Sequence, residues 1–264
     1  MGFMLGRVGN WLGRALSRPT HVHTLSQPTP VADLLACLRP GDVLLVEGHS
    51  RISTAIKYLT QSTWSHAALY VGDALNGRAP PDHCFVEADI VAGVRSIGIG
   101  EFASLHSRIC RPSGLSDEDC DAVVAYAIAR IGHQYDLRNV FDLARYLLPT
   151  PPVPQRFRRR MLALGSGDPT RAICSTLIAQ AFQSVRYPIL PAITRRASRD
   201  PMCPGCVEEI LHVRHHSLFA PRDFDVSPYF AVVKPTLARG FDYRALQWDD
   251  RPGREDAPRG EAMA

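Results

Sequence analysis

The segment Trp64-Ser65-His66-Ala67-Ala68-Leu69-Tyr70-Val71-Gly72 decides the fold of this chain. It predicts a short strand in which Ala68 and Tyr70 share the face of His66, because successive side chains of a strand point to opposite faces. A histidine here can act as a general base if an acceptor fixes its second ring nitrogen. A lone histidine at a strand end is more often a structural residue with its hydrogen bonds satisfied. Whether His66 is a catalytic base therefore depends on partners elsewhere in the chain.

The partner that the sequence offers is Cys174, which heads the apolar, helix-like stretch 172–182. A thiol attacks acyl carbon well only as thiolate, and the first turn of a helix favours that form through its dipole and free N–H groups. The same N–H groups, with the adjacent Ser175, can hold the oxyanion of a tetrahedral intermediate. The alternative is an inert cysteine, because free cysteines are among the most buried residues.

A third candidate lies in the stretch 83–89, where alternation places Phe85, Glu87 and Asp89 on one face. An acid in a hydrophobic strand is unusual unless it has a partner. Glu87 is predicted to orient His66, because Asp89 lies nearer the turn. The competing interpretation is an ion pair between Glu87 and an arginine such as Arg95 at the sheet edge.

The pattern around these residues predicts an antiparallel meander with flanking helices. Strands are expected within 41–48 and at 66–71, 84–88, 93–99, 108–111 and 229–234, and helices at 31–38, 52–59, 116–131, 139–148 and from 174 onward. Ser116 is the expected N-cap of its helix and Gly132 the stop. The sequence therefore predicts an α+β fold with a small antiparallel sheet packed against helices.

Four motifs in this order resemble those of the YaeF/YiiX group of permuted papain-like cysteine hydrolases. They are the strand from His66, Val86-Glu87-Ala88, Gly132-His133-Gln134-Tyr135-Asp136 and Cys174-Ser175-Thr176-Leu177. That group is related to the NlpC-type cell-wall peptidases and is similar to lecithin:retinol acyltransferase. The resemblance covers about residues 40 to 185, and the strand near 230 is expected to belong to the same domain.

The resemblance implies a permuted, NlpC-like fold with a Cys-His-Glu triad formed by Cys174, His66 and Glu87. It also accounts for the order of the pair, with the histidine before the cysteine. Tyr135 is expected to line the site or donate to the oxyanion, and its alternative is a packed aromatic under a loop. Ser65, beside the base, and Ser175 are further candidates for substrate or oxyanion contacts.

The predicted organisation is a basic amphipathic leader over residues 1–30, the hydrolase domain over 31–245 and a disordered tail over 246–264. Insertions are expected near 150–171, which is arginine-rich, and 186–222. The first leader residues, 1–18, carry apolar side chains at helical spacing with Arg7, Arg14 and Arg18, so peripheral contact with an anionic membrane is one interpretation. Packing on the domain or a frayed terminus is the other.

Composition excludes some classes of function. A formal net charge of +4 on 264 residues does not indicate nucleic-acid binding. Seven cysteines without a disulfide spacing favour a reducing compartment, and the N-terminus is a poor signal peptide, so a cytoplasmic location is expected.

No cofactor or resident metal is expected. Cys203 and Cys206 with His212 and His216 leave a zinc site open as an alternative.

The leading hypothesis from the sequence is a thiol hydrolase acting on a peptide-like amide or an ester. A lipid acyltransferase or phospholipase with the same triad is the alternative enzyme, favoured by the amphipathic leader. A catalytically silent binding protein of the same fold is the non-enzyme alternative. The oligomeric state is left open.

Overall fold

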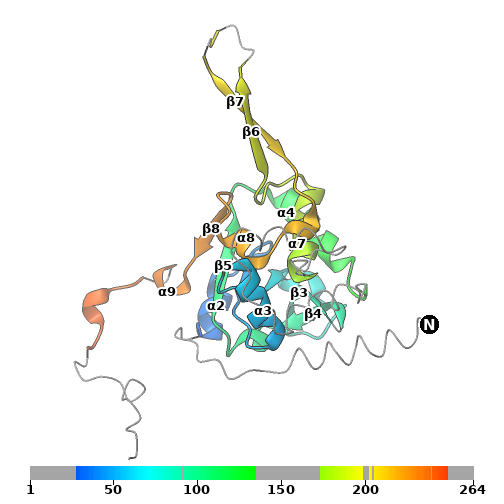
Figure 1. Ribbon diagram of the computed structural model, residues 1–264. Helices are drawn as coiled ribbons and strands as arrows, with labels where there is room; N and C mark the ends of the chain where they lie inside the picture. Colours follow the sequence, from blue (N-terminus) through cyan, green and yellow to red (C-terminus); the bar gives the residue numbers. More distant parts are fainter. Residues whose placement is uncertain are drawn as a thin grey trace, which may run out of the picture.

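A six-stranded antiparallel sheet lies at the centre of the computed structural model, which describes residues 28–90, 92–134, 173–198, 202–203, 205–238 and 240–248 (Figure 1). The strand order is β4-β3-β2-β1-β5-β8. Its strands are β1 (Val43–Val46), β2 (His66–Tyr70), β3 (His83–Asp89), β4 (Gly93–Gly98), β5 (Ser107–Pro112) and β8 (Phe230–Val233). The predicted strands are thereby confirmed.

Helices cover the sheet and connect its strands. They are α2 (Val31–Cys37), α3 (Arg51–Thr60), α4 (Asp117–Ile128), α7 (Ile173–Ser184), α8 (Pro221–Asp225) and α9 (Pro235–Ala238), with the 3-10 turns η1 (Gly72–Leu75), η2 (Ile99–Phe102), η3 (His216–Leu218) and η4 (Tyr243–Ala245). Ser116 caps α4 as predicted, because its hydroxyl accepts the N–H of Asp119 at 3.1 Å. The predicted helix at 139–148 lies outside the described residues.

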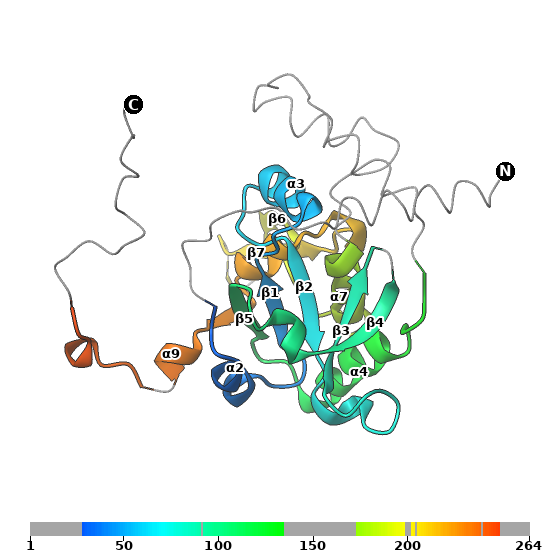
Figure 2. The ribbon, with the colours of Figure 1, turned by 90° about the horizontal axis from the view of Figure 1, so that it is seen from below.

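The alternation predicted for β2 divides its side chains between two hydrophobic clusters. Ala67 and Leu69 are fully buried in the larger cluster, together with Leu177, Ile178 and other residues of α7 and α4. Ala68 is fully buried in the smaller cluster, on the other face, where Leu34 of α2 also lies. The α7 helix lies against β2 and β3 (Figure 2), and the fold is α+β as predicted.

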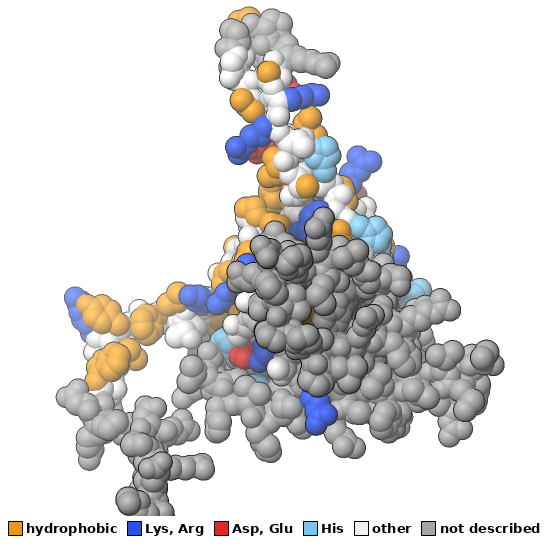
Figure 3. All heavy atoms as spheres, viewed as in Figure 1, with side chains coloured by type: hydrophobic (Ala, Val, Ile, Leu, Met, Phe, Trp, Pro, Cys, Tyr) orange, Lys and Arg blue, Asp and Glu red, His pale blue; other side chains and the backbone are white. Residues whose placement is uncertain are grey.

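The passage expected as an insertion at 186–222 contains an element that the sequence analysis did not predict. Its strands β6 (Ala192–Ala197) and β7 (Val207–His212) form a two-stranded antiparallel hairpin that projects from the body of the protein (Figure 1). Apolar and charged side chains are both exposed on its surface (Figure 3), and Arg195 and Arg196 pair with Glu209 and Glu208 across the strands. The hairpin therefore holds itself together largely by ladder bonds and exposed ion pairs.

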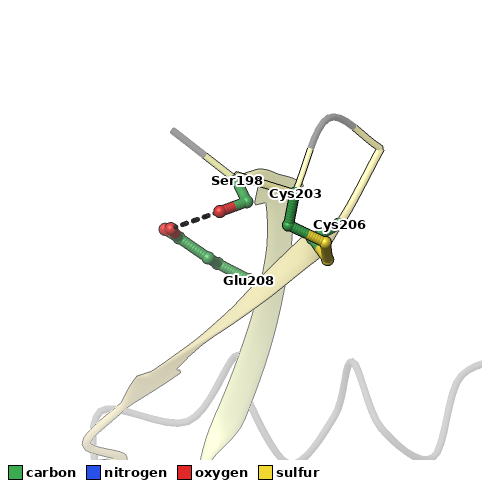
Figure 4. The surroundings of a disulfide bond; sticks show 4 residues. All are labelled: Ser198, Cys203, Cys206 and Glu208. Carbon is green, nitrogen blue, oxygen red and sulfur yellow. Dashed lines mark hydrogen bonds between the residues drawn. A yellow bond between two sulfur atoms is a disulfide. The ribbon is translucent and has the colours of Figure 1, made fainter. Parts of the chain in front are cut away.

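Cys203 and Cys206 form a disulfide near the tip of this hairpin, beside a hydrogen bond from Ser198 to Glu208 (Figure 4). The absence of a disulfide pattern in the sequence was therefore misleading for this pair, and the five other cysteines are free. The zinc alternative is also not formed, because both thiols are bonded to each other and His212 lies at the opposite end of the hairpin, paired with Ala192. Within the described ranges no group of three or more His, Cys, Asp or Glu residues is suited to hold a metal ion.

None of the described helices is long and apolar enough to cross a membrane. The leader positions 1–18, the arginine-rich segment 150–171 and the tail beyond residue 248 lie outside the described residues. The predictions made for them stay predictions.

A buried ion pair fixes the turn that leads into β1. The Asp42 carboxylate is 1% exposed and accepts hydrogen bonds from Nε of Arg111 at 2.9 Å, from Nη2 of Arg111 at 2.7 Å and from the Arg39 N–H at 2.8 Å. Arg111 lies on β5, next to β1 in the sheet, and also donates to the Cys37 carbonyl at 2.5 Å. The pair thus ties α2, the turn and β5 together.

We expect Asp42→Asn to lower the free energy of unfolding by about 3 kcal/mol, because it leaves the half-buried Arg111 guanidinium without its counter-charge. Glu209→Gln in the exposed pair with Arg195 is the control and should cost less than about 1 kcal/mol. Urea denaturation followed by circular dichroism measures both. Equal losses in the two variants would contradict the role given to the buried pair.

Candidate active site

Three elements bring the predicted triad to one end of the sheet. His66 is the first residue of β2 and pairs with Val46, the last residue of β1. Glu87 lies towards the end of β3, which runs antiparallel to β2 as its neighbour. Cys174 is the second residue of α7, the helix that packs on these two strands. Residues far apart in sequence are therefore adjacent at the point where β2 begins and α7 begins.

The imidazole of His66 is held by Glu87. Nε2 of His66 lies 2.6 Å from Oε2 of Glu87, whose side chain is 4% exposed. Because the anionic carboxylate only accepts hydrogen bonds, Nε2 is the protonated nitrogen of this pair. Nδ1 is then the ring nitrogen available to Cys174, whose charge and side-chain hydrogen bonding both act on the pKa of His66.

Three influences set the pKa of His66. Burial is the largest and lowers it, because desolvation disfavours the imidazolium. The charge interaction and hydrogen bond with Cys174, and those with Glu87, act in the opposite direction and outweigh burial. The pKa of His66 is consequently raised well above its ordinary value of 6.5. This environment favours the imidazolium form of His66 next to Cys174.

Glu87 keeps its negative charge although it is buried. Desolvation alone would raise the pKa of its carboxyl group. The charges and hydrogen bonds of His66 and Arg95 more than offset that effect and hold the pKa of Glu87 below its ordinary value. One carboxylate oxygen bonds His66 and the other bonds Arg95, so the contacts expected from both interpretations of Glu87 are present, and its role in orienting His66 stays a prediction.

The two candidate serines are buried and hydrogen-bonded inside the protein. The Ser175 hydroxyl donates to the Phe219 carbonyl at 2.7 Å, which ties the first turn of α7 to the segment before α8. The Ser65 hydroxyl accepts the Gly48 N–H at 2.8 Å. These bonds anchor the backbone on both sides of the site. The backbone N–H of Ser175, in the first turn of α7, is the part of that residue best suited to an oxyanion.

The remaining candidate, Tyr135, lies outside the described residues. Its assignment to the oxyanion or the pocket stays a prediction.

Trp64, next to Ser65 in the chain, takes part in a polar cluster that the sequence analysis missed. Its indole N–H donates to Asp225 at 2.9 Å, and Arg108 donates to the other oxygen of that carboxylate at 2.7 Å. The Arg108 guanidinium lies over the indole ring, 4.9 Å from its centroid. Asp225 is 161 positions from Trp64, so no local pattern in the sequence indicates this contact.

A thiol at a helix N-terminus, an imidazole at a strand end and a carboxylate on the neighbouring strand are the arrangement of a papain-like site. Residues 37–146 match the model of a family described as permuted papain-like amidase enzyme, YaeF/YiiX, C92 family. The resemblance found from the motifs is thereby confirmed for this segment of the chain. No match was found among curated proteins.

The family match and the geometry support different parts of the site. The matched segment contains His66 and Glu87 and ends before Cys174. The candidate nucleophile therefore rests on its place in α7 and on its interaction with His66.

We expect iodoacetamide at about pH 6 to alkylate Cys174 at least about tenfold faster than Cys84 or Cys120. Burial, the first cause in each case, raises the pKa of the Cys84 and Cys120 thiols, whereas His66 carries a persistent positive charge beside Cys174. Because the pKa of His66 is raised, this charge is present at low and neutral pH and is lost as the pH rises through the raised value. Peptide mass spectrometry measures the three rates.

His66→Ala is the matching variant for this measurement and should remove the advantage of Cys174. The proposed interaction between His66 and Cys174 would be refuted if Cys174 reacted no faster than Cys84 in the native protein. It would also be refuted if Cys174 reacted equally fast with and without His66.

Proposed function

We propose that the protein is a thiol hydrolase that cleaves a peptide-like amide or an ester through an acyl-enzyme on Cys174. The observation that carries the proposal is the position of His66, which interacts with the Cys174 thiol on one side and with the buried Glu87 carboxylate on the other. Three side chains that interact in this order supply a nucleophile, a proton carrier and a group that fixes the imidazole. The description of the matched family as an amidase supports the reaction class.

In the first half of the reaction the Cys174 thiolate attacks the carbonyl carbon, and the carbonyl π electrons move onto oxygen. The N–H groups of the first turn of α7 face the developing oxyanion in this proposal, since they have no acceptor within the helix. The tetrahedral intermediate collapses with cleavage of the bond to the leaving nitrogen or oxygen. The His66 imidazolium donates its proton to that leaving group, so a thioester and a neutral imidazole remain.

In the second half the neutral imidazole of His66 removes a proton from water, whose oxygen attacks the thioester carbonyl. Collapse of the second tetrahedral intermediate releases the carboxylic acid and the Cys174 thiolate, and the imidazolium is restored beside it. Glu87 does not transfer a proton in either half. Its role is to keep Nε2 protonated and Nδ1 directed at the thiol, and to stabilise the charge on the ring.

The acyl donor can be identified directly from the intermediate. Incubation with a fluorogenic aminoacyl amide should add the mass of the acyl group to the peptide that contains Cys174, whereas a phospholipid donor should add none. Cys174→Ala should abolish both the added mass and the turnover. Glu87→Gln should lower kcat by about 100-fold, because the neutral amide no longer stabilises the imidazolium.

Glu209→Gln on the projecting hairpin is the control for this experiment and should leave kcat unchanged. Full turnover by Cys174→Ala would refute the proposed hydrolase, and acylation by the phospholipid alone would replace the amidase with a lipid-directed enzyme.

A further inference from the structure

Arg95 of β4 lies directly opposite Glu87 of β3 in the strand register and binds the carboxylate oxygen that His66 leaves unused. Its Nε and Nη2 both lie 2.8 Å from Oε1 of Glu87, while Nε2 of His66 lies 2.6 Å from Oε2. The carboxylate thus joins two cationic partners through separate oxygens. We propose that Arg95 is a positioning residue that acts through Glu87 on His66, so that the working unit is a row of four residues. The inference rests on the proposed function.

The charge of Arg95 stays constant while that of His66 changes. In the proposed reaction the positive charge of His66 disappears whenever the imidazole gives its proton to the leaving group. Without Arg95, Glu87 would then be a carboxylate with a 4% exposed side chain and no counter-charge. Burial of an unpaired charge is costly in free energy. Arg95 stays protonated at every pH of interest. It therefore keeps Glu87 anionic through the step in which His66 is neutral and must remove a proton from water.

Arg95 also restricts the geometry of the Glu87 carboxylate. Two N–H groups of one guanidinium on a single carboxylate oxygen restrict the rotation of the carboxylate. With that rotation restricted, Oε2 is directed at Nε2 of His66, and the imidazole presents Nδ1 to Cys174. A lysine at position 95 would supply the charge as a point without the planar fork. Charge and geometry can therefore be separated by substitution.

The described groups that act on the charge of Arg95 have known signs. Burial of Arg95 disfavours its charge, and Glu87, Asp89 of β3 and Glu101 of η2 favour it, so that the pKa of Arg95 is raised. The side chain is 42% exposed, which weakens its interactions through solvent screening. The groups that face His66 are Cys174, Glu87 and the ring of Phe102. The centroid of the Phe102 ring lies 6.5 Å from that of the imidazole. Among the groups named, Arg95 is the nearest permanent cation to the Glu87 carboxylate.

Removal of the Arg95 charge should shift the pKa values of the neighbouring groups in one direction. A positive charge lowers the pKa of every neighbouring acid and imidazolium, so its loss makes protons bind more tightly throughout the row. In Arg95→Gln both limbs of the pH profile for alkylation of Cys174 by iodoacetamide should move to higher pH, by about one unit. The same displacement should appear in the pH profile of kcat with the fluorogenic amide.

Arg95→Lys separates the two contributions. It retains the charge, so the profile should keep its position, while the maximal rate should fall by about tenfold because the fork is lost. This variant also keeps the test decisive if Arg95→Gln does not fold, since a native maximal rate in Arg95→Lys would refute the geometric role. A displaced profile in a folded Arg95→Lys would refute the role of charge.

The hairpin offers a closely matched control. Arg195 lies opposite Glu209 in the register of β6 and β7, with Nε at 2.9 Å and Nη2 at 2.8 Å from Oε1 of that glutamate. Arg195→Gln removes the same pair of bonds outside the site and should leave both profiles unchanged. An unshifted profile in folded Arg95→Gln, or an equal shift in Arg195→Gln, would overturn the proposal.

The roles of Cys174 and Arg95 can be refuted separately. If Cys174 is no more reactive than Cys84, or Cys174→Ala keeps full turnover, the hydrolase itself is refuted. If Cys174 is reactive and required but Arg95→Gln behaves as the native protein, only the role of Arg95 is refuted. Thermal unfolding of each variant, followed by circular dichroism, establishes that it is folded before the profiles are compared.

Discussion

The hydrogen bond between Glu87 and His66 is the interaction on which the site depends, and it is possible only because β2 and β3 are neighbours. The bond places a nearly buried carboxylate against an imidazole at the end of the sheet. That contact fixes which ring nitrogen faces α7 and favours a charged ring beside Cys174. Without the neighbouring strands the carboxylate would be solvated and the imidazole free to turn. The pairing of β2 and β3 therefore holds the acid and the imidazole in contact.

The parts of the fold that follow a local period were predictable. Alternation in β2 and β3, the Ser116 cap of α4 and the apolar run of α7 each depend on residues within one element. The candidate triad could also be assembled from the sequence, because its members fall in motifs whose order resembles a known group. Their mutual geometry could not, since it depends on the order of strands in the sheet and on where α7 docks.

The features that were missed arise from contacts between distant segments or from weak local signals. The cluster of Trp64, Arg108 and Asp225 joins the start of β2, β5 and α8, which no sequence period relates. The β6–β7 hairpin has no buried face, so its strands lack the apolar alternation that marks β2. Its disulfide joins cysteines three positions apart, a spacing that also suits a turn or a metal site. Arg95 was recognised only as a competitor for Glu87, because the sequence does not show that a carboxylate has two occupied oxygens.

The position of Cys174 on a late element has a consequence for biosynthesis. The sheet strands that carry His66 and Glu87 precede α7 in the chain, so a ribosome completes the base and its orienting acid well before it adds the thiol. The proposed nucleophile gains its electrostatic environment only when α7 settles on β2 and β3. In this scheme a chain truncated before α7 lacks the nucleophile and cannot attack a carbonyl.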